Sequence, residues 1–284
     1  MIYVSTGGFK YLGYEAVIKE LSQAGIAAFE LSGGIFSPDV TNRLKELREK
    51  YALSLHNYFP PPEKPFVLNL ASFRDDIVKD SMRHITNAID LSSLIGAKFY
   101  SFHAGYLIDP KACQLGQKIN KQELNPRKKA LHCFIMRASA LAEYAESKGV
   151  KLLVENNVLS HQNFASFGEN PLLMVDQFET SEIMNKSHHN LGLLIDVAHL
   201  KVSANTLCFS AVDYLSEFYS FTDAYHLSDN SGFEDSNDEI TKSSWFWPYV
   251  RKSAEYYSLE VYNKPADFLK SQIVLIQEML SQYD

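Results

Sequence analysis

Four side chains that can bind a divalent metal ion stand at or near the ends of four successive apolar segments of the sequence. They are Glu155, Asp196, His226 and Glu260, and consecutive members lie about 30 to 40 residues apart, the length of a strand, a helix and two short loops. Residues at the carboxyl ends of parallel strands meet at one edge, which in a (β/α)8 barrel carries the active site. Three carboxylates and an imidazole there predict a divalent metal site, and therefore an enzyme.

Three further histidines belong to the same predicted edge. His56 and His103 end two earlier apolar segments, and His199 follows Asp196 by three positions. A single histidine at a strand end is more often a hydrogen-bonded structural residue than a ligand. The joint pattern favours a functional site, because ionised carboxylates that close buried strands need a metal ion or charged partners. These histidines are therefore possible additional ligands of a metal or of the substrate.

Eight short apolar segments can position these side chains as strands. Most of the segments are largely apolar rather than strictly alternating, which is typical of a parallel sheet covered by helices. We predict strands over Ile2–Ser5, Ala27–Leu31, Ala52–His56, Lys98–His103, Val150–Glu155, Leu191–Asp196, Asp223–Leu227 and Ser258–Tyr262.

Segments with helical periodicity separate most of these strands. We predict helices over Tyr14–Ala24, Asp39–Tyr51, Arg74–Ile95, Arg127–Lys148, Pro171–Lys186, Ser203–Tyr219 and Pro265–Gln282. Gly25, Gly96 and Gly149 each stand between a helix and the next strand, where a left-handed residue often ends a helix. This alternation predicts an α/β fold, and eight repeats favour a closed (β/α)8 TIM barrel formed as one domain by residues 1–284.

Three long segments follow strands and interrupt this pattern: Asn57–Phe73, Ala104–Pro126 and Asp229–Tyr249. Loops after the strands of a barrel usually shape the substrate pocket. Several aromatic residues after the strands can cover the C–H faces of a sugar or simply pack the loops. They are Phe59, Tyr106, Trp245 and Trp247.

Composition limits the class of protein further. The chain has 284 residues, of which 46% are hydrophobic, and a net charge of −7. This acidic balance gives no general attraction to nucleic acid or to an anionic membrane. Three widely spaced cysteines make a disulfide framework improbable and favour the cytoplasm. We expect neither a signal peptide nor a membrane span, and the sequence leaves the oligomeric state open.

The ordered segments resemble the xylose isomerase-like TIM barrels. This family includes sugar isomerases and epimerases, inosose dehydratases and endonuclease IV-type AP endonucleases. The resemblance covers nearly the whole chain and rests on short motifs: Leu55-His56-Asn-Tyr-Phe, Leu68-Asn-Leu-Ala-Ser72, Phe102-His103-Ala-Gly105, Val154-Glu155-Asn-Asn157, Asp196-Val-Ala-His199-Leu and His226-Leu-Ser-Asp229. It implies that Glu155, Asp196, His226 and Glu260 hold one divalent ion (Mn²⁺, Mg²⁺ or Zn²⁺) and that the two glutamates act as acid and base.

The nuclease branch of the family has to be weighed separately. Its members carry histidines that resemble His56, His103 and His199 and bind a trinuclear zinc cluster. They also carry an Asp-x-His motif after the seventh strand, where this chain has Asp235-Ser-Asn237 and no histidine from Asp229 to Tyr249. The acidic balance lacks the basic surface that a phosphate backbone requires. The basic residues in 118–129 are more simply explained as a solvated helix start than as a DNA contact.

The favoured function is a metal-dependent sugar isomerase or epimerase with a small-molecule carbohydrate substrate. The metal would act as a Lewis acid, and Glu155 and Glu260 would move a proton at the carbon next to a carbonyl. Two alternatives stay open: an endonuclease IV-like metal-dependent phosphodiesterase, and a catalytically silent barrel that binds a sugar.

Overall fold

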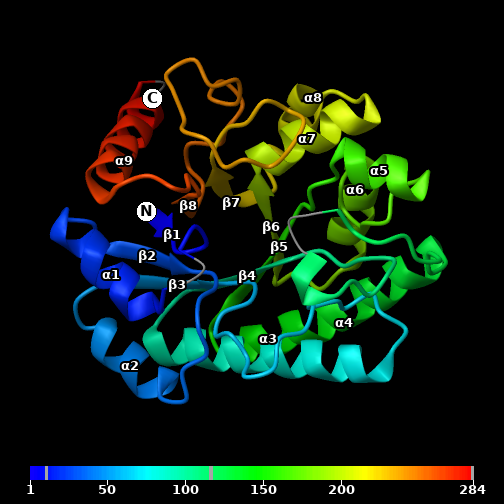
Figure 1. The fold of residues 1–284 in the computed structure, drawn as a ribbon, viewed down its shortest axis with the longest axis horizontal. Coiled ribbons are helices and arrows are strands. Elements are labelled where there is room, and N and C mark those ends of the chain that lie inside the picture. The colour runs from blue at the N-terminus through cyan, green and yellow to red at the C-terminus, as the bar shows by residue number, and fades with distance from the viewer. Residues whose placement is uncertain (10–11, 115–117, 283–284) are drawn as a thin grey trace.

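Eight parallel strands form a closed barrel in the computed structural model, which describes residues 1–9, 12–114 and 118–282 (Figure 1). The ring follows the chain order and closes where Tyr3 of the first strand pairs with Ser258 of the last. The strands are β1 (Ile2–Ser5), β2 (Ala28–Leu31), β3 (Ala52–His56), β4 (Phe99–His103), β5 (Lys151–Glu155), β6 (Leu191–Asp196), β7 (Thr222–Leu227) and β8 (Tyr256–Leu259). The predicted (β/α)8 TIM barrel is confirmed, while the assignment of residues 1–284 to a single domain stays a prediction.

Helices surround the barrel and bury the outer faces of its strands (Figure 1). In β6 every residue is buried, which explains why the strand segments are continuously apolar. The helices are α1 (Tyr14–Gln23), α2 (Val40–Leu47), α3 (Asp75–Ile95), α4 (Arg127–Ser147), α5 (His161–Phe167), α6 (Gln177–Lys186), α7 (Val197–Leu207), α8 (Ala211–Phe218) and α9 (Ala266–Ser281), and a short 3-10 helix covers Ala112–Gln114. No described helix is long and apolar enough to cross a membrane.

The predicted helix Pro171–Lys186 begins too early. The helix found there, α6, starts after Asp176, whose side chain accepts hydrogen bonds from the backbone N–H groups of Phe178 and Glu179. Leu172 instead pairs with Tyr106 in an antiparallel bridge, and Met174 has a left-handed backbone with φ 56°. The sequence analysis also missed the short helix α5.

The predicted helix Ser203–Tyr219 is two helices, and its start is wrong by six residues. The carboxylate of Asp196 accepts from the N–H groups of Ala198 and His199, so α7 begins directly after β6. The left-handed Cys208, with φ 58°, then ends α7.

The predicted strand Ser258–Tyr262 is also displaced, since β8 ends at Leu259 and Glu260 is the first residue after it.

Asn69 ties two of the long loops together. Its side-chain amide donates to the carbonyl groups of Tyr106 and Ile108, and its Oδ1 accepts from the N–H groups of Ala71 and Tyr106. Gly105 makes this close approach possible, because a Cβ at that position would lie 2.8 Å from Asn69 Oδ1. The two loops therefore present Tyr106 at a fixed place on the rim.

The third long loop connects β7 to β8 and contains no α-helix in residues 228–255, all of which are described. It forms the coil at the top of Figure 1. Trp247 is buried and donates from Nε1 to the carbonyl of Thr241 at 2.7 Å, and Phe59 in the first loop is fully buried against Tyr14. These two aromatic residues pack the loops, which excludes them as covers for a substrate. Residues 115–117 of the segment Ala104–Pro126 lie outside the described residues.

Candidate metal centre

The imidazole of His226 lies inside a buried cluster of carboxylates at the carboxyl ends of the strands. Its Nδ1 is 3.3 Å from Glu155 Oε1, 3.5 Å from Glu260 Oε2 and 4.0 Å from Asp196 Oδ2. Glu155 ends β5 and Asp196 ends β6. His226 lies in β7, one residue before its end, and Glu260 directly follows β8. The structure thus brings all four predicted metal ligands to one point.

Asp196 has two roles that are divided between its two oxygens. Oδ1 caps α7 by accepting from the N–H groups of Ala198 at 2.7 Å and His199 at 2.8 Å. Oδ2 has no hydrogen-bond partner among the described residues and faces the cluster. The helix cap therefore holds the carboxylate in one orientation and leaves one oxygen free to bind a cation.

His56 and His103 approach the second oxygen of Glu155. His56 Nδ1 lies 2.9 Å from Ser101 Oγ, and its Nε2 lies 3.4 Å from Glu155 Oε2. His103 Nδ1 lies 3.6 Å from the same oxygen. Glu155 Oε1 faces His226, so this carboxylate belongs to two groups of possible ligands. One group is Glu155 with His56 and His103, and the other is Glu155 with Asp196 and His226. In each group the ligand atoms are close enough together to hold a metal ion. His56 and His103 therefore belong to the cluster, as the sequence predicts.

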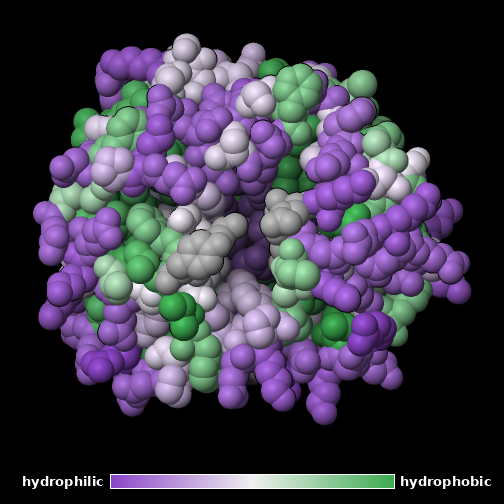
Figure 2. Space-filling model, viewed as in Figure 1, coloured by the Kyte–Doolittle hydropathy of each residue, from purple (hydrophilic) through white to green (hydrophobic). Residues whose placement is uncertain are grey.

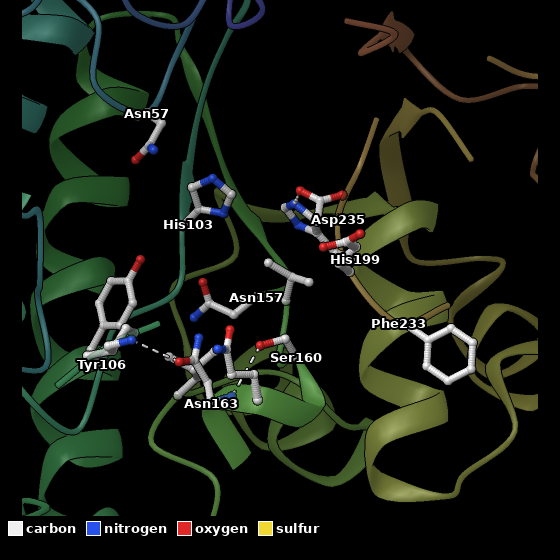
Figure 3. Close-up of a pocket in the computed structure, with 14 residues that line it drawn as sticks. Asn57, His103, Tyr106, Asn157, Ser160, Asn163, His199, Phe233 and Asp235 are labelled. Atoms are coloured by element: carbon white, nitrogen blue, oxygen red, sulfur yellow. Dashed lines mark hydrogen bonds and ion pairs between the residues drawn. The ribbon is translucent and has the colours of Figure 1, made fainter. Parts of the chain in front are cut away.

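His199, in α7, also contacts the cluster, since its Nδ1 is 3.3 Å from Glu155 Oε1 and its Nε2 is 3.7 Å from Asp196 Oδ2. Its Nδ1 is 3.0 Å from the carbonyl oxygen of Asn156, and its Nε2 is 3.3 Å from Asp235 Oδ2 (Figure 3). Asp235 comes from the long loop after β7. Asn237 stands two residues later and uses its carbonyl oxygen to accept from the N–H of Tyr262. The Asp-Ser-Asn segment thus brings a carboxylate to His199 but no second imidazole.

Glu30 is the member of the cluster that the sequence analysis missed. It lies in β2, has no exposed surface, and its Oε1 is 3.0 Å from His226 Nε2. The signal in the sequence was a single acidic residue inside an otherwise apolar strand. Glu30 lies one residue before the end of β2, as His226 does in β7.

Buried polar atoms without hydrogen-bond partners gather in this cluster. Among the described residues they include both carboxylate oxygens of Glu155, Asp196 Oδ2 and both ring nitrogens of His226. Buried polar groups of a native protein are normally satisfied, and an uncompensated buried carboxylate is especially costly. This donor set of oxygen and imidazole atoms fits a divalent cation.

The carboxylates of the cluster affect the protonation of His226 and of Asp196. Although burial opposes its charge, Glu30, Glu260 and Glu155 raise the pKa of His226 well above its usual value. Burial raises the pKa of Asp196, and the neighbouring carboxylates Asp235, Glu155 and Glu260 raise it further. In the metal-free protein a charged His226 thus balances part of the negative charge. A cation bound at Nδ1 requires the neutral imidazole, so its binding has to release a proton.

A cavity of about 430 Å³ opens beside the cluster. His103, His199 and Asp235 lie on its wall, and Tyr106 points its hydroxyl group into it (Figure 3). Figure 2 shows the hollow at the centre of this face, with hydrophilic residues inside it. The cluster is thus open to a small molecule on one side.

A separate group of possible ligands lies elsewhere. Glu146, at the end of α4, is 2.8 Å from His189 and 3.9 Å from His188, which both precede β6. Glu146 and His189 are exposed, and the group lies where the chain enters β5 and β6, at the amino-terminal ends of these strands. It can therefore serve as a reference for unspecific metal binding.

Comparisons with known proteins agree with the fold. The family model described as xylose isomerase-like TIM barrel matches residues 18–249. No curated protein matches the chain.

Several solved structures cover nearly all of the chain. A D-tagatose 3-epimerase-like protein is 20% identical with a TM-score of 0.72, covering 98% of this chain and 96% of its own. D-psicose 3-epimerase with D-tagatose from Clostridium cellulolyticum is 13% identical with a TM-score of 0.65, covering 100% and 92%. The IOLI protein with a zinc atom is 12% identical with a TM-score of 0.66, covering 100% and 99%. At these identities the likeness shows the fold alone.

Proposed function

Since the chain belongs to the xylose isomerase-like TIM barrel family, we propose that it is a divalent-metal-dependent sugar isomerase or epimerase. The observation that carries this proposal is the convergence of Glu155, Asp196 and Glu260 on Nδ1 of His226. Sugar epimerases among the structures of the same fold support the substrate class.

Glu155, Asp196, His226 and Glu260 would hold the metal ion. Buried atoms of Glu155, Asp196 and His226 lack hydrogen-bond partners, and Glu260 Oε2 lies 3.5 Å from His226 Nδ1. Together they supply three carboxylates and one neutral nitrogen, a set suited to Mn²⁺, Mg²⁺ or Zn²⁺. When bound, the ion supplies Lewis-acid stabilisation of the negative charge that develops on the substrate oxygen.

Glu155 and Glu260 are the candidates for proton transfer. They reach the cluster from strands on different sides of β6 and β7, so that a sugar carbon between them would meet one carboxylate on each face. One carboxylate removes the C–H proton from the carbon that bears a hydroxyl group next to a carbonyl. The other glutamate, or a water molecule, returns a proton to the same carbon in an epimerase or to its neighbour in an isomerase.

Two histidines would assist binding of the substrate and the metal ion rather than transfer the proton. Burial, together with the charges of His56 and His199, lowers the pKa of His103 to about 4, so its imidazole is neutral near pH 7. A neutral imidazole on the cavity wall can donate a hydrogen bond to a sugar hydroxyl group or accept one from it. His199, held between Asn156 and Asp235, would orient Asp196 or bind a second ion.

Exchange of a substrate proton with deuterated water tests the proposal directly. The metal-loaded protein should incorporate deuterium at the carbon next to the carbonyl of a ketose. Removal of the metal with a chelator should stop the exchange, and re-addition should restore it. No exchange with a broad panel of ketoses and aldoses, at full metal occupancy, would make a silent sugar-binding barrel the better assignment.

One observation favours a second candidate, a metal-dependent phosphodiesterase. His56 and His103 approach the free oxygen of Glu155, and His199 pairs with Asp235, so the cluster offers ligands beyond those that one ion needs. The elemental content of the purified protein separates the two functions. One ion per chain supports isomerase chemistry, and two or three zinc ions support hydrolysis of phosphoesters.

A further inference from the structure

We propose that the cavity beside the cluster selects an uncharged sugar, so that the substrate of the proposed reaction is a free ketose rather than its phosphate ester. This inference rests on the proposed function and narrows its substrate class. It follows from the charges and hydrogen-bonding groups of the residues that line the cavity.

The wall of the cavity carries two carboxylates and no lysine or arginine. Glu234 and Asp235 line it, and none of its lining residues, all of which are described, is a lysine or an arginine. Enzymes that recognise a phosphate group normally supply arginine, lysine or several free backbone N–H groups. Asp235 already pairs with His199, and a phosphate dianion beside Glu234 would be repelled.

The start of α5, at the edge of the cavity, is capped by the side chain of the residue that precedes it. Ser160 precedes α5 and accepts a hydrogen bond at Oγ from the N–H of Asn163 at 3.3 Å. The neighbouring start of α7 is capped by Asp196. Neither helix therefore offers a ready place for an anion.

Two basic residues, one in α7 and one at the start of α4, are already paired. Lys201 Nζ lies 2.6 Å from Asp229 Oδ1, and Arg127 Nη1 lies 2.6 Å from Glu179 Oε1. Each of these side chains would have to leave its carboxylate to reach a phosphate. Lys118 is exposed beside Ile119, which lines the cavity.

Asn57 offers a neutral group that suits a hydroxyl. Its backbone has a left-handed φ of 45° and is held at both ends. The N–H donates to the carbonyl of Ser101 at 2.6 Å, while the carbonyl accepts from Tyr100 at 2.6 Å and His84 at 3.0 Å. Both backbone groups of Asn57 thus have hydrogen-bond partners. Its side-chain amide lies at the cavity (Figure 3).

Tyr106 and Gln162 add further neutral partners. Burial and the charge of Glu155 raise the pKa of Tyr106 to about 12, so its hydroxyl group stays protonated and can donate. Gln162 lines the cavity from α5. Amides and hydroxyl groups next to apolar residues such as Leu172 match the alternating hydroxyl groups and C–H faces of a sugar.

Binding of unreactive analogues tests the inference independently of catalysis. The probes are a hexitol and the same hexitol with a terminal phosphate, titrated calorimetrically into the metal-loaded protein. We expect the hexitol to bind at least about tenfold more tightly. Tighter binding of the phosphate, or binding of neither probe, would overturn the inference.

Deuterium exchange with a ketohexose and with its 6-phosphate separates this inference from the proposed function. Faster labelling of the free ketose supports both. Faster labelling of the phosphate ester overturns the inference and leaves the isomerase proposal standing. Labelling of neither, together with tighter hexitol binding, supports the cavity assignment and counts against the reaction.

Two substitutions probe the cavity itself. Asn57→Gly removes the amide and keeps a residue that accepts the left-handed backbone, and it should weaken hexitol binding about 3- to 10-fold. Gln162→Lys adds one positive charge and should raise the affinity for the phosphate relative to the hexitol. An unchanged hexitol affinity in Asn57→Gly, together with an unchanged ratio of the two affinities in Gln162→Lys, would refute the assignment of the cavity.

One lysine serves as a control. Lys118→Ala should leave the ratio of the two affinities unchanged. A lower affinity for the phosphate in this variant would show that the lysine recognises it, which contradicts the inference.

Discussion

Glu30 Oε1 lies 3.0 Å from His226 Nε2, and neither side chain has exposed surface. The pair joins β2 to β7 through the interior of the barrel. Glu30 attracts the proton to Nε2 and leaves Nδ1, which faces three carboxylates, as the nitrogen that a cation can bind. Carboxylates that hold the far nitrogen of a ligating histidine commonly affect metal affinity.

We predict that Glu30→Gln weakens metal binding about 10- to 100-fold. Glutamine keeps the shape of the side chain but loses the charge that fixes the proton on Nε2. Calorimetric titration with Mn²⁺ or Zn²⁺ measures the effect, and His189→Ala, in the exposed group near α4, is the matched control. Equal affinities of Glu30→Gln and wild type would show that Glu30 does not position His226.

Asp196→Asn and His226→Ala should lower the metal content of the purified protein. The asparagine variant is more informative than alanine, because its side-chain oxygen can still cap α7 while the charge at the cluster is lost. Elemental analysis after dialysis gives the content per chain. Wild-type metal content in both variants would place the ion elsewhere, for instance at Glu146, His188 and His189.

Glu155→Gln and Glu260→Gln should each reduce isomerase or epimerase activity by about 10²-fold or more, the usual contribution of general acid–base catalysis. Since both glutamates are also proposed ligands, the rates have to be compared at saturating metal. Far-ultraviolet circular dichroism should show the same fold in both variants. Near-wild-type rates with the metal in place would remove these residues from the proton transfer.

His103→Ala distinguishes the two candidate chemistries. In an isomerase the loss of one imidazole on the cavity wall should weaken substrate binding and leave the four-ligand group at His226 intact. In a phosphodiesterase it should remove a ligand and abolish cleavage of DNA with an abasic site. Cleavage by the wild type that disappears in His103→Ala would assign the protein to the nuclease branch.

His84 should make the protein sensitive to acid. Burial lowers its pKa in the folded state, although the hydrogen bond to the carbonyl of Asn57 opposes this. In the unfolded chain the pKa is about 6.5, so below that pH the unfolded state binds a proton that the folded state does not. The free energy of unfolding should therefore fall by up to about 1.4 kcal/mol per pH unit from this group as the pH drops.

Urea unfolding of wild type and His84→Gln between pH 7.5 and pH 5 checks this prediction. The variant should lose less stability over that range, while the difference between the two proteins should be constant above pH 7. A parallel decline in both proteins would show that His84 does not titrate differently in the folded and unfolded states.

The barrel and most of the cluster could be predicted from the sequence, because local patterns determine them. Continuously apolar segments separated by helical periodicity specify buried parallel strands, and the ends of such strands have to meet at one rim. For that reason Glu155, Asp196 and His226 could be named before any coordinates. The helix cap of Asp196 was also encoded locally, but the apolar residues after it hid the start of α7.

Other features depended on contacts between residues far apart in the chain. Glu30 lies in β2, and only closure of the barrel brings its side chain to His226 of β7 across the interior. Asp235 comes from a loop without regular structure, whose path is decided by packing of residues such as Trp247 against the core. The cavity and its lack of positive charge arise where loops from different strands meet. The sequence alone therefore determined the repeating elements and the ligands at their ends, whereas the tertiary structure decided which charges face one another, because those distances are set by packing and not by neighbours in the chain.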